Sequence, residues 1–174
     1  MAKYPPESSY LLAKITKNDP TLQKKDKRIK LGSLCAWYYP DPKWQKTNYD
    51  TIPLVLILNA DKTHVFGINL HFISWSQRLS FMKYILSKKG RVKYIDIKKA
   101  FQKAKVPQAL AYYALRKYLI SHIRSNVFVF DEDDWYRLAK DFAPKFVGGS
   151  AQQIYTDIQK RFTVQRKKIN TKKK

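Results

Sequence analysis

The sequence is poor in the features that mark several common classes of protein. It contains one cysteine, Cys35, so an internal disulfide and a multi-cysteine metal site are both excluded. No apolar run approaches the roughly 20 residues of a membrane-spanning helix, and the first ten residues hold no apolar stretch long enough for a signal peptide. We therefore expect a soluble protein, made in a reducing compartment, with no membrane partner.

Sequence patterns of common catalytic sites are also lacking. The chain has no GxxxxGKS or GxxxxGKT, GxGxxG or HExxH pattern. The sequence therefore does not indicate a phosphate-binding loop or a zinc-protease site. His64 and His71 are seven positions apart, and this odd separation would place them on opposite faces of one strand, which disfavours a shared metal. His122 lies in an apolar segment and fits a hydrogen-bonded core residue. We predict no catalytic residue, no metal site and no cofactor.

Acidic residues are scarce, and four of them stand together at 131–134. This block could bind Mg²⁺ in a nuclease. However, acids in the first turn of a helix also complement the helix dipole and cap free N–H groups, which explains the block without any chemistry. We therefore expect that the protein is not an enzyme.

The scarcity of acids leaves a large positive charge. The chain has 35 Lys+Arg against 13 Asp+Glu, for a formal net charge of +22. A charge of this size repels itself in a compact monomer and attracts counter-ions strongly. The sequence therefore predicts a polyanionic partner. On charge alone, DNA, RNA, an anionic membrane and an acidic protein surface all qualify.

Hydrophobic residues make up 44% of the chain, enough for a real core. We predict an α+β fold, with a small antiparallel sheet or SH3-like barrel at about residues 31–73. Strands are expected over 34–39, 53–58 and 64–73, and the continuous apolar run at 53–58 is typical of a strand covered on both faces. In the third strand, a period of two would place four residues on one face: Phe66, Ile68, Leu70 and Phe72.

A helical subdomain is expected to follow the sheet. Apolar residues at helical spacing indicate helices over about 79–86, 97–104, 108–123 and 135–142, with a short strand over 127–130. Asp96 is expected to cap the second of these helices. The segment 108–123 is apolar nearly all round and is expected to form the central helix.

Basic extensions are predicted at both ends. Residues 1–30 form a basic N-terminal arm. Residues 31–147 form the globular body, β-rich over 31–73 and mainly helical over 74–147. Residues 148–174 comprise a Gly-Gly-Ser hinge, a helix over about 152–162 and a basic C-terminal tail.

The basic residues are concentrated in three zones: the arm, a central stretch and the tail. Between Arg78 and Arg124 there are 13 basic residues and one acid, and from Gln159 to Lys174 there are eight and no acid. Lysine predominates, and because it acts as a point charge, the zones indicate contact with phosphates and not base reading. The predicted nucleic-acid-binding residues are Lys24, Lys25, Lys27, Arg28, Lys30, Lys88, Lys89, Arg91, Lys93, Lys98, Lys99, Lys103, Lys105, Lys160, Arg161, Arg166, Lys167, Lys168, Lys172, Lys173 and Lys174. Most aromatic residues fall on apolar stripes, where core packing explains them, and Trp44, Tyr49 and Tyr94 are the candidates for base stacking.

Three segments together resemble a known family. They are LGSLCAWYYP (31–40) with YDTIPLV (49–55), GINLHFI (67–73), and SHIRS (121–125) with VFVF (127–130) and Trp135. Over roughly residues 31–158, this order is similar to a family of virion proteins of contractile-tailed, T-even-like phages that is associated with the DNA end protector. The resemblance implies a structural virion protein near the packaged DNA end or the head–tail axis. The chain lacks the extended C-terminal region of longer family members, so the resemblance implies a virion protein more than the particular end-protecting role.

The prediction for function is therefore a non-enzymatic structural protein of the virion, made in the host cytoplasm. Its partners would be nucleic acid, most simply double-stranded DNA bound without regard to sequence, and other virion proteins in a multi-protein assembly. Two alternatives remain open. One is a tail or baseplate component whose basic ends hold protein neighbours, and the other is a stand-alone DNA- or RNA-binding protein.

Overall fold

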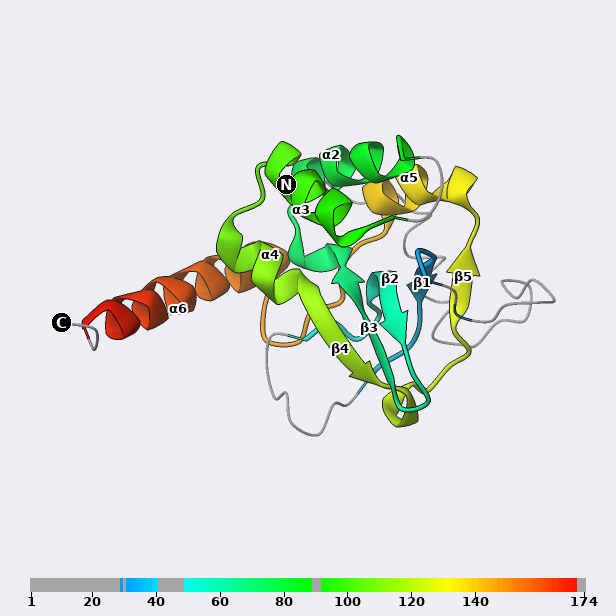
Figure 1. The fold of residues 1–174 in the computed structure, drawn as a ribbon. Coiled ribbons are helices and arrows are strands. Elements are labelled where there is room, and N and C mark those ends of the chain that lie inside the picture. Colours follow the sequence, from blue (N-terminus) through cyan, green and yellow to red (C-terminus); the bar gives the residue numbers. More distant parts are fainter. Residues whose placement is uncertain (1–28, 30, 41–48, 89–91, 172–174) are drawn as a thin grey trace.

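The computed structural model describes residues 29, 31–40, 49–88 and 92–171. This part of the chain forms an α+β fold, in which a five-stranded antiparallel sheet is joined to five α-helices (Figure 1). The predicted fold class is confirmed. The predicted N-terminal arm lies outside the described residues, apart from Ile29.

The sheet is open and mixes strands from both halves of the chain. Its strands are β1 (Leu34–Ala36), β2 (Leu54–Ala60), β3 (His64–Asn69), β4 (Leu115–Leu119) and β5 (Phe128–Phe130). They are arranged in the order β4-β3-β2-β1-β5, and every neighbouring pair is antiparallel. Because β4 and β5 stand at opposite edges, the sheet does not close. Of the two predicted arrangements, the antiparallel sheet is correct and the barrel is wrong.

Both faces of the sheet are buried, which is why the central strand is apolar at successive positions. On one face, Leu54 and Leu56 of β2 join the main core beneath the helices. On the other face, Val55 and Ile57 join a smaller cluster with Trp37. Side chains alternate between the faces of a strand, so a strand covered on both sides needs apolar residues throughout. The prediction of a doubly covered strand at 53–58 is confirmed.

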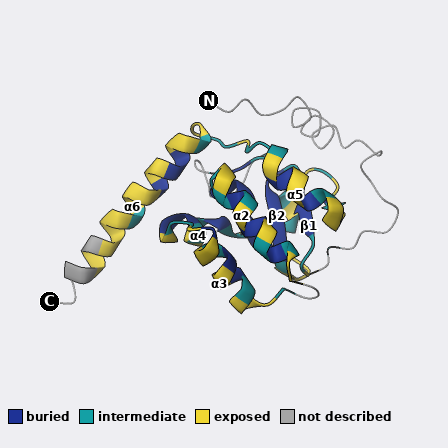
Figure 2. Ribbon diagram, turned by 90° about the horizontal axis from the view of Figure 1, so that it is seen from above, coloured by how far each residue is buried: buried dark blue, intermediate teal, exposed yellow. Residues whose placement is uncertain are grey.

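Three helices cover the face of the main core. Helix α2 (Trp75–Leu86) packs against both α3 (Tyr94–Lys103) and α5 (Glu132–Asp141), as Figures 1 and 2 show. Phe81, Met82 and Ile85 of α2 are fully or almost fully buried. None of the described helices combines the length and the apolar composition that crossing a bilayer requires.

The third predicted strand is shorter than expected. Strand β3 ends at Asn69, whose side-chain oxygen accepts a hydrogen bond from the backbone N of His71 (2.9 Å) and caps the 3₁₀-helix η2 (Leu70–Phe72). Leu70 and Phe72 are buried, but they lie in this turn and not on a strand face. Phe66 is 38% exposed. It pairs with Asn59, beyond a register shift in β2, so the expected four-residue face does not form.

The predicted long helix at 108–123 is wrong. Helix α4 (Gln108–Ala114) ends after two turns, and the chain continues as strand β4 and then the 3₁₀-helix η3 (Ile120–His122). Strand β4 pairs with β3 along its length, from Leu115 opposite Ile68 to Leu119 opposite His64. Pairing with the free edge of β3 satisfies the backbone N–H and C=O groups that a helix would otherwise have satisfied.

Helix α6 (Ala151–Thr171) is longer than the predicted 152–162 and takes in most of the expected tail. It follows Gly148, whose φ of 98° suits glycine alone. Ile154, Tyr155 and Ile158 anchor its first half in the core. The second half contains no glycine or proline, and its Lys, Arg and Gln residues favour helix. The helix projects from the body in both views (Figures 1 and 2).

Candidate nucleic-acid interface

Ten of the predicted basic site residues have described side chains, and all ten are exposed: Lys88, Lys93, Lys98, Lys99, Lys103, Lys105, Lys160, Arg161, Arg166 and Lys168. The others lie outside the described residues or, for Lys167, have a side chain that is not described: Lys24, Lys25, Lys27, Arg28, Lys30, Lys89, Arg91, Lys167, Lys172, Lys173 and Lys174. The described cations come mainly from α3, the turn after it, and α6.

Helix α3 carries lysines because only one of its faces is buried. Ile97 and Ala100 pack into the core, and Lys98 and Lys99 between them point away from it. The sequence predicted that Asp96 caps this helix, but the N-cap position is occupied by Lys93. Asp96 lies in the first turn, and its carboxylate accepts from the backbone N of Lys93 (3.1 Å), so it still satisfies a free donor at this end.

The ends of α2 and α3 bring two lysines together. Nζ of Lys88 lies 4.9 Å from the ring centre of Tyr84, and Nζ of Lys103 lies 5.2 Å from the same ring. Cation–π attraction of this kind contributes about 0.5–1 kcal/mol at an exposed site. Both lysines also lie at the C-terminal end of a helix, where the dipole favours positive charge. The position of these two cations is therefore set by the fold.

The turn between α3 and α4 is rigidly built and exposes a further lysine. Lys105 has a φ of 51°, in the left-handed region. The side-chain amide of Gln77 donates to its carbonyl oxygen (2.8 Å), and the backbone N of Val106 donates to the carbonyl oxygen of Phe101 (3.1 Å). These bonds hold a strained conformation and leave the side chain of Lys105 exposed.

Helix α6 reaches the same region. Nη1 of Arg166 donates to the side-chain oxygen of Gln108 (3.2 Å), at the start of α4 and three positions after Lys105. One turn further along α4, Tyr112 is 68% exposed, and its ring centre lies 6.4 Å from that of Phe162 on α6. The turn after α3 and the second half of α6 therefore both border the start of α4, beside an exposed aromatic ring. We call this surface, formed by Lys103, Lys105, Tyr112 and Arg166, the α3–α6 junction.

The acidic block is placed away from this junction. Asp131 is the N-cap of α5, and the other three acids occupy the first turn of that helix. Asp134 also accepts from Arg137 (3.0 Å). The prediction that the block begins a helix is confirmed. In Figure 1, α5 and the projecting part of α6 lie on opposite sides of the body.

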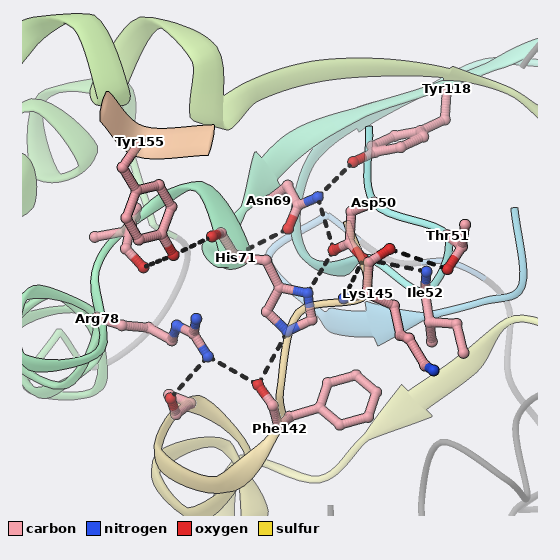
Figure 3. Close-up of polar contacts among 12 residues, drawn as sticks. Asp50, Thr51, Ile52, Asn69, His71, Arg78, Tyr118, Phe142, Lys145 and Tyr155 are labelled. Carbon is pink, nitrogen blue, oxygen red and sulfur yellow. Dashed lines mark hydrogen bonds and ion pairs between the residues drawn. The ribbon is translucent and has the colours of Figure 1, made fainter. Parts of the chain in front are cut away.

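Sequence reasoning did not identify a buried polar network in the core (Figure 3). Asp50 precedes β2, Asn69 ends β3, and His71 lies in η2; all three are buried. Nδ1 of His71 is bonded to the carboxylate of Asp50, and Nε2 donates to the carbonyl oxygen of Phe142 (3.1 Å). Asn69 donates to Asp50 (3.3 Å) and to the hydroxyl of Tyr118 (3.1 Å). The sequence did contain one sign of this network, because Asn69 and His71 are polar residues at alternate positions within an apolar run.

The protonation of this network follows from its geometry. Burial would raise the pKa of Asp50, but His71 and hydrogen bonds from its neighbours bring that pKa below its usual value. Burial lowers the pKa of His71, and Asp50 opposes the shift. A carbonyl oxygen only accepts, so Nε2 of His71 carries a proton, and the bond from Nδ1 to Asp50 requires a second one. We therefore assign one shared proton to the Asp50–His71 contact.

Arg78 places a buried cation beside this network. Its Nη1 donates to the carbonyl oxygens of Ala139 (3.3 Å) and Phe142 (2.9 Å). Its Nε and Nη2 have no hydrogen-bond partner among the described residues. Tyr155 of α6 donates to the carbonyl oxygen of His71 (2.6 Å), which ties the base of α6 to the network. The network thus positions α2, the segment after α5 and α6 around the sheet.

The histidines and the stacking candidates are placed as follows. His64 is half-buried on β3, and His122 is half-buried in η3, with its ring 6.0 Å from that of Tyr39. Within the described ranges, no three His, Cys, Asp or Glu residues come close enough to hold a metal ion. Of the stacking candidates, Tyr94 is 77% exposed and Tyr49 is half-buried. Trp44 lies outside the described residues.

Comparison with known proteins adds no relative from which a role could be carried over. No family model, no curated protein sequence and no solved structure matches the chain. The resemblance to a phage virion family stays a prediction.

Proposed function

We propose that this protein is a non-enzymatic structural component of a tailed-phage virion that holds double-stranded DNA near the packaged end or the head–tail axis. It binds the DNA through its phosphates, without regard to sequence, while its body contacts other virion proteins. The observation that carries the DNA-binding part is the α3–α6 junction, where exposed cations of the turn after α3 and of α6 flank the start of α4. The virion location is supported by the resemblance of residues 31–158 alone.

Phosphate contact suits the composition and rigidity of the junction. Lys103 and Lys105 are single point charges held by the fold, and Arg166 adds a planar guanidinium. Each phosphate contact releases condensed counter-ions, which gives affinity that is independent of sequence and falls steeply with salt. The exposed ring of Tyr112 adds a surface against which a sugar or an unpaired base can pack.

The buried network supports a role without catalysis. The side chains of His71 and Asp50 are inaccessible to solvent, so no substrate can reach this His–Asp pair. Both ring nitrogens of His71 are engaged, and their partners lie on segments far apart in the chain. The arrangement suits structural support better than proton transfer to a ligand.

A matched pair of triple variants tests the DNA-binding surface. Lys103→Gln, Lys105→Gln and Arg166→Gln together remove three charges from the junction. The control, Lys62→Gln, Lys140→Gln and Lys145→Gln, removes three exposed charges from other parts of the fold. Affinity for duplex DNA is measured by fluorescence anisotropy from about 50 to about 200 mM salt. We expect the slope of log K against log salt to fall by about one unit for each phosphate that the junction variant no longer binds.

The control variant should change the slope by clearly less, although its net charge is the same. Equal reductions in the two variants would show that general charge, and not the junction, binds DNA. Absence of salt-dependent binding by the unmodified protein would refute the DNA-binding proposal as a whole.

A further inference from the structure

The second half of α6 is exposed on every side. Successive residues of an α-helix point about 100° apart, so four in a row cover nearly its full circumference. Residues 163–166 are all exposed, and Lys168 and Ile169 beyond them are exposed as well. The hydrogen bond between Arg166 and Gln108 joins two exposed side chains and leaves this part of the helix uncovered. Figure 2 shows it extending beyond the body.

This part of α6 has the dimensions of a groove-binding helix. Residues 163–171 extend for about 13 Å at about 1.5 Å per residue, and a helix with its side chains is about 10–12 Å wide. The major groove of B-form DNA is about 12 Å wide and admits a helix, whereas the minor groove, at about 6 Å, does not. The body would then bring Lys103 and Lys105 towards the flanking phosphates.

The positive charge of the second half of α6 favours a negatively charged partner. No acid occurs after Asp157, and the helix carries Lys160, Arg161, Arg166 and Lys168. A second copy of the same helix would be repelled, which disfavours self-association through α6. The exposed apolar side chains are few: Val164 is 51% exposed and Ile169 is 56% exposed. In the major groove such side chains can contact the methyl group of thymine.

We propose that the second half of α6 inserts into the major groove of duplex DNA while Lys103 and Lys105 of the α3–α6 junction contact the adjacent backbone. This inference rests on the proposed DNA binding and specifies further that the bound duplex is B-form. A-form RNA has a deep and narrow major groove that side chains cannot read, so the same helix does not fit there. The protein therefore prefers B-form DNA to double-stranded RNA of equal length and charge.

The first test compares the full-length protein on a DNA duplex and an RNA duplex of the same sequence at fixed salt. We expect binding to DNA to be tighter by about tenfold or more. Dimethyl sulfate, which methylates guanine N7 in the major groove, should modify the bound DNA less than the free DNA. Equal affinities without N7 protection would overturn groove insertion and leave phosphate binding standing.

The second test separates the helix from its charge. Gln165→Pro keeps every cation but removes a helical hydrogen bond and introduces a clash within α6, while Gln165→Ala keeps both charge and helix. We expect the proline variant to lose the preference for DNA and the N7 protection, and the alanine variant to retain both. Ile154, Tyr155 and Ile158 lie upstream, so unchanged thermal melts should show that the body remains folded.

Unchanged DNA preference in the proline variant would show that an intact helix is not required, which contradicts the inference. A protein that binds neither duplex but is captured by an acidic protein would refute the inference and the proposed DNA binding together. The two proposals are therefore separable, because only groove insertion depends on the duplex form and on an unbroken α6.

Discussion

Replacing Asp50 by alanine removes an acceptor on which four donors depend. One carboxylate oxygen accepts from the backbone N of Ile52 (3.2 Å) and of Lys145 (3.0 Å). The other accepts from Asn69 (3.3 Å) and is bonded to His71. Alanine offers none of these groups a replacement, and the site is closed to bulk water because Asp50 is only 3% exposed.

The expected decrease in stability is large for a single substitution. Removing one partner of a buried ion pair costs about 3–5 kcal/mol, because the other charge stays buried without its partner. Asp50→Asn should cost less, about 1–3 kcal/mol. Its amide oxygen can still accept from Ile52 and Lys145, and its amide N–H can donate to Nδ1 of a neutral His71. A larger loss of stability in Asp50→Ala than in Asp50→Asn would therefore show that the hydrogen bonds of the network stabilise the fold.

The contribution of Asp50 should also depend on pH. The pKa of Asp50 is lowered in the folded protein, so folding favours the ionised carboxylate. Such a group adds stability above its unfolded pKa, near 3.8, and that contribution is lost as the pH falls through the folded pKa. The stability that the ionised Asp50 carboxylate adds to the unmodified protein should therefore be lost below about pH 4, and Asp50→Asn, which has no such carboxylate, should not show this loss.

Urea unfolding followed by circular dichroism measures these differences, with a constant m-value as the check that the unfolded surface is unchanged. Asp133→Ala is the surface control, since an exposed first-turn acid is worth about 0.3–1 kcal/mol. If Asp50→Ala were no more destabilising than this control, the buried network would not hold the fold together, and the assignment of the shared proton would fail with it.

Two further predictions concern the sheet and the assembly. Gly67→Ala should destabilise by about 1–3 kcal/mol in the same unfolding assay, because a Cβ at this position would lie 2.5 Å from both the backbone oxygen of Leu56 and a methyl group of Val55; an unchanged midpoint would show that β2 and β3 are less closely paired than described. If the protein is a virion component, it should copurify with phage particles at fixed stoichiometry after nuclease treatment and in about 1 M salt, where the Debye length is only about 3 Å. Release under those conditions would favour a stand-alone nucleic-acid-binding protein.

Elements with one strong local signal could be predicted. The apolar run at 53–58 indicated a doubly covered strand, and β2 has a buried residue at every position from Leu54 to Ile57. The acids at 131–134 indicated a helix start, and α5 begins there. In each case, the residues that determine the element lie within it, so the pattern is legible without knowing its neighbours.

The segment 108–123 could not be predicted in the same way. Its apolar residues fit a helix all round, and α4 does form at its start. The remainder becomes β4 because the edge of β3, some 50 positions earlier in the chain, offers a ladder of backbone partners from His64 to Ile68. Local propensity is weak compared with a tertiary pairing of this kind.

The α+β class, the excess of basic charge and the helices that carry it are all legible in the amino-acid sequence, because composition and hydrophobic period are local properties. The burial of Asp50 beside His71, and the contact of Arg166 on α6 with Gln108 at the start of α4, became visible only in the folded chain. Both depend on which distant segments become neighbours. That choice is made by the packing of the whole core, in which α6 is anchored through Tyr155 to the turn that carries His71. No pattern within α3 or α6 contains that information.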